Sequence, residues 1–275
     1  MHPILFSIPK FDLFGRMFGP VHIFSYGAML ALAFLLSIAL ASWESRRAGY
    51  SGDEILDVSV YIIIAAIVMS RVFYVITSLH EYSGHGIDAL KVYQGGLSFH
   101  GGVVGGALAV IFYCRRKGIP VLRMADIMVP ALALGLAMGR IGCFLNGCCF
   151  GCQTHLPWGI VFPALGDGVH RHPTQLYDCL MNLCIMLLLL FPLKKLKRKD
   201  GDLLAFWLLL SGITRFIMEI FRAGQSSVIT WPGITMAQWL CIAMAAAGIA
   251  MYLAKFPVPK SPPAVATAAK KNGAK

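Results

Sequence analysis

Long apolar stretches dominate this sequence and determine the solvent in which it can fold. A helix needs about 20 apolar residues to cross about 30 Å of hydrocarbon, because its backbone must satisfy its own hydrogen bonds there. Hydrophobic residues make up 57% of the chain and charged residues 13%, against about 25% charged residues in soluble domains. We therefore predict an all-α integral membrane protein. Seven transmembrane helices are expected, near residues 22–43, 55–78, 97–114, 125–144, 174–193, 203–222 and 234–254.

Basic residues are distributed unevenly between the segments that connect these stretches. By the positive-inside rule, the side rich in Lys and Arg faces the cytoplasm, which predicts a periplasmic N-terminus and a cytoplasmic C-terminus. The net charge of +11 then reflects topology and attraction to anionic lipid, and we expect no nucleic-acid partner. Sixteen of the 24 Lys and Arg lie on the basic side: Arg46, Arg47, Arg115, Arg116, Lys117, Arg123, five in the run at 194–199, and five from Lys255 onward. Only Lys10, Arg16, Lys91 and Arg171 lie on the other side.

The domain organisation predicted from this pattern is simple. We expect residues 1–256 to form one seven-helix transmembrane domain, because no polar stretch is long enough to bury a core of its own. Residues 257–275 have no hydrophobic periodicity and are rich in Pro, Ala and Lys. We expect them to form a disordered basic cytoplasmic tail.

Four arginines, Arg71, Arg140, Arg215 and Arg222, lie inside or at the ends of the apolar stretches. A charge at this depth costs about 2.5–3.5 kcal/mol on insertion scales, so such residues usually face a polar interior. Arg215, Glu219 and Arg222 are spaced i, i+4, i+7 and share one helix face. One carboxylate can neutralise only one guanidinium, so an anionic ligand is the expected remaining partner. Snorkelling or a structural ion pair is the alternative, above all for Arg222.

Two further motifs place polar residues at the ends of predicted helices. His100 lies in GGLSFHGGVVGG, where Gly101 with Gly105 and Gly102 with Gly106 have the GxxxG spacing that permits close helix packing. An imidazole there can accept a proton near neutral pH, although a lone histidine can also be structural. In RHPTQLYD at 171–178, Pro173 fits the first turn of a helix, and His172 is open to a structural or a binding role.

Four cysteines, Cys143, Cys148, Cys149 and Cys152, follow Arg140 with CxxxxCCxxC spacing. This spacing lacks the paired CxxC pattern of dependable structural zinc sites, so we expect no metal and no cofactor. A disulfide on the oxidising side and a metal site remain the alternatives. The favoured interpretation is free thiols that pack like small apolar side chains.

Several sequence blocks together resemble one family, prolipoprotein diacylglyceryl transferase. They are SYG at 25–27, GGLSFHGG at 95–102, GRIGCFLNGCCFG at 139–151, RHPTQLYD at 171–178 and RFIMEIFR at 215–222. The resemblance implies a multi-pass transferase of the bacterial inner membrane that performs the first step of lipoprotein maturation. Such an enzyme transfers diacylglyceryl from phosphatidylglycerol to the lipobox cysteine of a prolipoprotein signal peptide, leaving a thioether and releasing glycerol 1-phosphate. Its partners are therefore phosphatidylglycerol, the prolipoprotein and membrane lipids, without a metal.

The resemblance also implies roles for individual residues. His100, Arg140 and Arg215 are the expected catalytic residues, with His100 either the general base for the thiol or an orienting group. The expected substrate-binding residues are Tyr26, Arg140, Asn146, Gly151, His172, Arg215, Glu219 and Arg222. The chain departs from the common family pattern at three positions: Cys143 replaces an asparagine, Cys148 a glutamate and Ser211 a tyrosine.

Two other classes of protein fit parts of the pattern when the resemblance is set aside. An anion transporter would use the same arginines, but it should carry paired, broken helices related by an internal repeat. Each block here occurs once. A metal-dependent redox carrier would use the cysteines, but it leaves Arg215 and His100 without a function.

Overall fold

The helices form where the sequence predicts them. The structure is a computed structural model that describes residues 2–8, 11–13, 16–79, 95–222, 229–230 and 233–254. Each predicted stretch contains a helix whose ends lie within four residues of the predicted ones, and the predicted tail at 257–275 lies outside the described residues. The long helices are α1 (Ser25–Arg47), α2 (Gly52–Thr77), α3 (Phe99–Lys117), α4 (Val121–Asn146), α5 (Thr174–Leu190), α7 (Asp202–Arg222) and α8 (Met236–Leu253). A short helix, α6 (Pro192–Leu196), extends α5.

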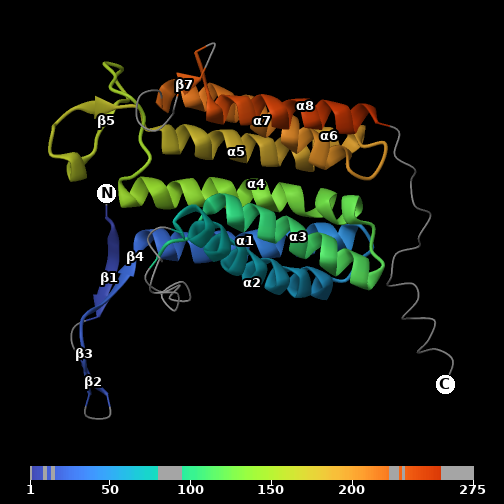
Figure 1. Ribbon diagram of the computed structural model, residues 1–275, viewed down its shortest axis with the longest axis horizontal. Helices are drawn as coiled ribbons and strands as arrows, with labels where there is room; N and C mark the ends of the chain where they lie inside the picture. The colour runs from blue at the N-terminus through green and yellow to red at the C-terminus, as the bar shows by residue number, and fades with distance from the viewer. Residues whose placement is uncertain are drawn as a thin grey trace. The chain divides into compact units, whose positions relative to one another are not determined.

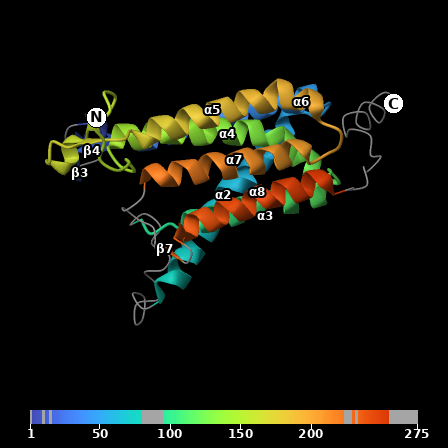
Figure 2. The ribbon, with the colours of Figure 1, turned by 90° about the horizontal axis from the view of Figure 1, so that it is seen from above.

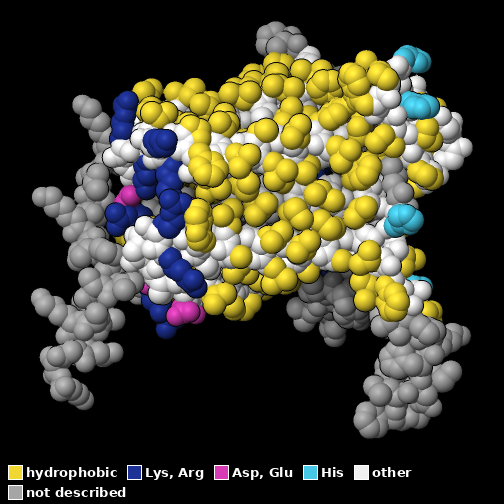
Figure 3. Space-filling model, turned by 180° about the vertical axis from the view of Figure 1, so that it is seen from behind, with side chains coloured by type: hydrophobic (Ala, Val, Ile, Leu, Met, Phe, Trp, Pro, Cys, Tyr) yellow, Lys and Arg dark blue, Asp and Glu magenta, His cyan; other side chains and the backbone are white. Residues whose placement is uncertain are grey.

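Six of these helices are long and apolar enough to cross a membrane: α1, α2, α4, α5 with α6, α7 and α8. Their outer surfaces carry large exposed hydrophobic residues, such as Leu35, Ile64 and Leu180, each at least 59% exposed. Hydrophobic side chains cover most of the face drawn in Figure 3. Because water would penalise such a surface, the chain is a multi-pass membrane protein. The predicted third span forms helix α3. This helix is less apolar than the other six, because it contains four glycines and ends in Arg115, Arg116 and Lys117.

The chain divides into two compact units, and each is described by itself. One unit contains Met1–Leu40 and Met128–Pro257, and the other contains Ala41–Ile127 and Val258–Lys275. In the second unit, α2 and α3 pack against each other along their length. A Cβ at Gly101 would collide with the carbonyl oxygen of Met69, and a Cβ at Gly105 with that of Ala65. The predicted close helix approach at Gly101 and Gly105 is therefore confirmed, and the pairing makes the two helices antiparallel.

In the first unit, α7 packs against both α5 and α8, as Figures 1 and 2 show. The buried cluster between α4, α5 and α7 consists of Val129, Ala133, Ile185, Leu189 and Leu203. The basic run after α5 folds against the same helices, because the Asp202 carboxylate accepts backbone N–H bonds from Arg198 and Lys199 at 2.8 and 3.1 Å. The Lys199 ammonium donates to the carbonyls of Met251 and Ala254 at the end of α8. A cation there complements the helix dipole.

Short antiparallel strand pairs occur at the helix ends, and the sequence analysis did not predict them. They are β1 (Ile4–Ile8) with β4 (Val21–Phe24), β2 (Phe11–Leu13) with β3 (Arg16–Phe18), β5 (Ile160–Val161) with β6 (His170–Arg171), and β7 (Ile229–Thr230) with β8 (Ile234–Thr235). A 3-10 turn, η4 (Pro163–Leu165), lies between β5 and β6. Strands of two to five residues are too short to produce a periodic signal. The β5–β6 pair matters for the site, because it leads directly into α5.

The α2–α3 contact generates a matched pair of substitutions. We expect Gly105→Ala to destabilise the protein by about 1–3 kcal/mol, because the added methyl has no room against the Ala65 carbonyl. Gly106→Ala is the control, since a Cβ there would meet only Ile62 at 3.6 Å. That variant should be neutral or gain up to about 1 kcal/mol of helix propensity. Thermal unfolding in detergent measures both, and equal midpoints would contradict the packing.

Candidate active site

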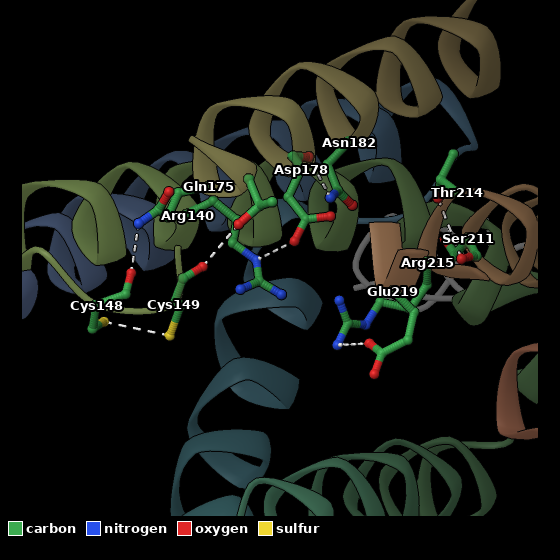
Figure 4. Close-up of polar contacts among 11 residues, drawn as sticks. Arg140, Cys148, Cys149, Gln175, Asp178, Asn182, Ser211, Thr214, Arg215 and Glu219 are labelled. Atoms are coloured by element: carbon green, nitrogen blue, oxygen red, sulfur yellow. Dashed lines mark hydrogen bonds and ion pairs between the residues drawn. The ribbon is translucent and has the colours of Figure 1, made fainter. Parts of the chain in front are cut away.

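Arg140, in the last turns of α4, forms an ion pair with Asp178 on α5. Its Nε lies 3.0 Å from Asp178 Oδ2, and the two side chains are only 27% and 8% exposed. Figure 4 shows the pair, with the two terminal nitrogens of the guanidinium pointing away from the carboxylate. The ion pair therefore holds Arg140 in place through one nitrogen and leaves the other end of the guanidinium available to a ligand.

Arg215 and Glu219 form a second ion pair within α7. Nη2 of Arg215 lies 3.3 Å from Oε2 of Glu219, which confirms that the i, i+4 spacing places them on one face. Glu219 is 3% exposed. Nη1 of Arg215 is buried and has no hydrogen-bond partner in the described part of the chain. A buried donor of this kind normally has a partner, so this atom marks a place for an acceptor.

The positive charges in this region outnumber the negative ones. Arg140 and Arg222 lie close enough to Arg215 to repel its charge, while Asp178 and Glu219 attract it. Among the described residues, this group contains three guanidinium groups and two carboxylates. One positive charge is left over in a poorly hydrated place, where an anion such as a lipid phosphate would be held strongly.

The loop that follows α4, residues 147–152, is fixed by α5 and by the end of α7. Gln175 Nε2 donates to the Cys148 carbonyl at 2.6 Å, and Thr174 Oγ1 donates to the Cys149 carbonyl at 2.9 Å. Gln175 and Thr174 are at most 1% exposed. The Cys152 N–H donates to the Phe221 carbonyl at 2.8 Å, next to Arg222 in sequence. The loop is therefore held by α7, which carries Arg215 and Arg222, and by α5, which carries the ion-pair partner of Arg140.

Gly151 lies at the most crowded point of this loop. A Cβ there would come within 2.6 Å of Thr174 Cγ2, 2.8 Å of the Phe221 carbonyl oxygen and 2.9 Å of His172 Cβ. The Gly151 N–H donates to the His172 carbonyl at 2.9 Å. Packing alone thus requires glycine at this position, and its predicted contact with substrate stays a prediction.

Three of the four clustered cysteines bring their sulfurs together. The Sγ atoms of Cys143, Cys148 and Cys149 all lie within 4.8 Å of one another, and those of Cys148 and Cys149 are 3.4 Å apart. Cys152 does not belong to this group. No disulfide joins any of the eight cysteines of the chain in the structure. The predicted free-thiol state stays a prediction, and convergence of three sulfurs is more than the packing of small apolar side chains requires.

The protonation states of the two loop cysteines are strongly affected by their surroundings. When Cys149 is ionised, its sulfur accepts hydrogen bonds from the Cys143 and Cys148 thiols, and Arg222 and Arg140 stabilise the charge; these effects outweigh burial and lower its pKa to about 5. Burial raises the pKa of Cys148. Its neighbours and the arginines therefore favour ionisation of Cys149 over that of Cys148.

His172 is buried in a hydrogen-bonded chain of aromatic residues. Its Nδ1 lies 3.2 Å from the Tyr177 hydroxyl, which accepts a hydrogen bond from Trp158 Nε1 at 2.8 Å. The ring of His172 also packs edge-on against Phe221. Pro173 precedes the first residue of α5 as its N-cap, one position earlier than predicted. These contacts explain His172 as an anchor of the loop, and its predicted role in substrate binding stays a prediction.

Tyr26 is the second residue of α1, and Asn146 is the last residue of α4, directly before the loop. The Tyr26 ring is 42% exposed and packs on Gly142 of α4, where a Cβ would meet it at 3.2 Å. Asn146 is hydrogen-bonded to the thiol of Cys148. With Pro3, Pro163 and Ala164, it lines an open groove of about 320 Å³. Both side chains are thus accessible from the loop side of the unit.

His100 belongs to the other unit. It is the second residue of α3, is exposed, and its ring lies edge-on to Phe99 at 6.0 Å between centroids. Arg71 on α2 fixes the segment that precedes α3. The sequence did not reveal which groups this arginine contacts. Nη1 of Arg71 donates to the carbonyls of Gly95 and Gly96 at 2.7 and 3.1 Å. Arg71 is 7% exposed, so this arginine positions the segment that leads to His100.

Comparison with known proteins gives one consistent family. The family described as prolipoprotein diacylglyceryl transferase matches residues 14–254. The chain belongs to this family. Three relatives are named phosphatidylglycerol–prolipoprotein diacylglyceryl transferase. The Clostridium tetani protein is 35% identical over a match that covers 81% of this chain and 86% of the relative. The protein of Wolbachia pipientis subsp. Culex pipiens is also 35% identical, over 92% of this chain and 94% of the relative. That of Paracidovorax citrulli is 32% identical over 89% and 96%.

Within this transferase family, the structure adds residues that sequence reasoning did not assign. Asp178 is the partner of Arg140, Gln175 and Thr174 hold the cysteine loop, and Arg71 holds the segment before His100. Asp178 and Gln175 carried a signal, since both follow RHPT as polar residues that enter an apolar helix. Two acceptors of Arg71 are the backbone carbonyls of Gly95 and Gly96, which leave no mark in the sequence.

The crowding at Gly151 generates a stability prediction. We expect Gly151→Ala to lower the free energy of unfolding by about 1–3 kcal/mol, because the methyl would overlap Thr174 and the Phe221 carbonyl. Gly139→Ala, a change in α4 where a Cβ meets nothing within 4 Å, is the control and should not lower it. The readout is the thermal midpoint of the purified variants. An unchanged midpoint for Gly151→Ala would favour a role in binding alone.

Proposed function

We propose that this chain transfers the diacylglyceryl group from phosphatidylglycerol to a prolipoprotein, in lipoprotein maturation. Membership of the transferase family and the names of the relatives support this activity. The observation that carries it in the structure is the surplus positive charge of Arg140, Arg215 and Arg222, together with the unpartnered Nη1 of Arg215. A phospholipid supplies the anion that such a group requires.

The chemistry follows from the charge that develops during the reaction. The sulfur of the lipobox cysteine attacks the glyceryl carbon, the bond from this carbon to the phosphate oxygen breaks, and glycerol 1-phosphate leaves with the electron pair. A thioether remains on the signal peptide. Guanidinium groups that are already oriented stabilise the leaving phosphate without reorganising, which is the largest usual source of catalysis. Arg140 and Arg215 fill this role, and Asp178 and Glu219 hold them in orientation.

The remaining proposed contacts surround these two arginines in the same unit. Arg222 adds positive charge, Tyr26, a 42% exposed residue, offers its hydroxyl to the lipid headgroup, and Asn146 lines the groove beside the loop. Gly151 and His172 shape the loop through packing and hydrogen bonds. In this proposal they bind substrate through the backbone groups of the loop that they shape. His100 is the proposed base that accepts the thiol proton, or alternatively a residue that orients the headgroup.

The membrane setting completes the proposal. The enzyme lies in the bacterial inner membrane, with α3 as a seventh span beside the six apolar helices. In each unit the basic residues gather at one end of the helices: Arg46, Arg47 and Arg115 to Lys117 in one, and the run at 194–199 in the other. These ends face the cytoplasm, and the N-terminus faces the periplasm.

Replacement of Arg140 tests the proposed phosphate contact. Arg140→Ala should lower the transfer rate by about 100-fold or more, because the leaving phosphate loses an oriented cation. Arg140→Lys should recover only part of the loss, since an ammonium cannot bond Asp178 and a ligand with the same fork geometry. The assay is transfer of labelled glycerol from phosphatidylglycerol to a lipobox peptide by purified protein. Arg116→Ala, at the exposed end of α3, is the control. Full activity of Arg140→Ala would remove Arg140 from the site.

The two possible roles of His100 can be separated by kinetics. We expect His100→Gln to lose about 100-fold in transfer rate with an unchanged KM for phosphatidylglycerol, because an amide cannot accept the thiol proton. His155→Gln, at an exposed loop position, is the control. A variant whose main defect is a raised KM for phosphatidylglycerol would instead assign His100 to headgroup orientation.

A further inference from the structure

Two of the three converging cysteines stand where this chain departs from the common pattern of its family. The Sγ atoms of Cys143, Cys148 and Cys149 lie within 4.8 Å of one another, with 3.4 Å between Cys148 and Cys149. Sulfurs bound to one tetrahedral zinc ion, at about 2.3 Å each, are about 3.8 Å apart. The three sulfurs therefore already have nearly the spacing of zinc ligands, and small side-chain rotations would complete it.

The backbone that carries these sulfurs is built to bring them together. Cys149 has a φ of 66°, the only positive φ of a non-glycine residue in the described part of the chain. This conformation costs about 1–2 kcal/mol for an ordinary residue, so it persists only where the surroundings enforce it. Gln175 and Thr174 enforce it here through their bonds to the Cys148 and Cys149 carbonyls. Figure 4 shows the result, with the sulfurs of two consecutive residues facing each other.

Nearby positive charge favours the metal-binding form of one of these cysteines, Cys149. A metal ligand must be a thiolate, and a group of thiolates requires nearby positive charge. Arg140 and Arg222 supply it, since both act on the sulfur of Cys149. Three thiolates and one divalent cation together carry a single negative charge, less than the three thiolates would carry alone. Thiolates select zinc and similar soft cations over magnesium or calcium.

We propose that Cys143, Cys148 and Cys149 bind one zinc-class divalent cation through their three sulfurs. The described residues add no fourth His, Cys, Asp or Glu to the group, so one coordination position stays open. An open position is the mark of a catalytic site rather than a structural zinc site. All three side chains are partly exposed, which leaves this position accessible from outside the loop.

The ligand that fits the open position is the acceptor thiol, an assignment that rests on the proposed function. On binding, the lipobox thiol would give up its proton to the proposed base His100 or to water, and the cation would stabilise the resulting thiolate. That sulfur then forms the bond to the glyceryl carbon, and the carbon–oxygen bond to phosphate breaks with its electron pair on the phosphate. The cation thus supplies a thiolate at neutral pH, beside the arginines that receive the leaving group.

A disulfide is the main competing state of these cysteines. It would use two of the three sulfurs and leave the third without a function. Three sulfurs that converge on one point, close to two arginines, are better explained by a cation that all three share. The two states differ in composition, so a direct measurement separates them.

The first test measures metal content and does not depend on activity. The full chain is purified in detergent, incubated with zinc and desalted, and its zinc is quantified by elemental mass spectrometry. We expect one zinc per chain, lost in Cys143→Ser, Cys148→Ser and Cys149→Ser and kept in Cys184→Ser, an exposed cysteine on α5. Helix content by circular dichroism confirms that each variant is folded. Equal zinc content in all variants would overturn the proposal. So would native protein that binds no zinc and whose intact mass is lower by two hydrogens, which indicates a disulfide.

The second test examines the open position with cobalt in place of zinc. Cobalt bound by thiolates absorbs visible light, and a lipobox peptide that adds a fourth sulfur should change this spectrum. A peptide with serine in place of the cysteine should not. A spectrum that is indifferent to the cysteine peptide would refute the role in thiol binding. If the cobalt spectrum responds but labelled glycerol is not transferred, the metal site stands and the proposed transferase function fails.

Discussion

The ion pair between Arg140 and Asp178 is the interaction on which the site depends. A lone guanidinium inside an apolar helix bundle is costly, and the carboxylate on α5 offsets that cost. It also fixes which nitrogens of Arg140 remain free. Because Asp178 uses only Nε, the pair stabilises the arginine without using all of its donors. The same division recurs on α7. Glu219 holds one nitrogen of Arg215, and another nitrogen has no partner among the residues that the structure describes.

The α5 helix links the different parts of this unit. Its first turns carry Thr174 and Gln175, which hold the cysteine loop, and then Asp178, which holds Arg140. Further along, Ile185 and Leu189 form the apolar core with α4 and α7. A displacement of α5 would therefore move both the arginine and the thiols. This arrangement couples the geometry of the anion site to that of the sulfur cluster through one rigid element.

The sequence predicted the parts of this fold that depend on local pattern. Helix positions follow from the length of apolar stretches, and the shared face of Arg215 and Glu219 follows from helical spacing. Contacts between distant segments could not be read in this way. Asp178 lies on a different helix from Arg140, and Arg71 donates to the backbone carbonyls of Gly95 and Gly96. Convergence of the cysteines depends on the backbone at Cys149, which residue type does not predict.

The crowding around Gly151 bears on how sequences of this family are interpreted. The glycine is enclosed by a methyl group, a carbonyl oxygen and a ring-bearing Cβ, so almost any substitution requires its neighbours to change with it. An invariant glycine at this place in relatives would therefore record steric exclusion around the chain, whether or not a lipid ever approached it. Sequence invariance and contact with substrate are separate properties. At this position only contact with substrate would be informative about catalysis.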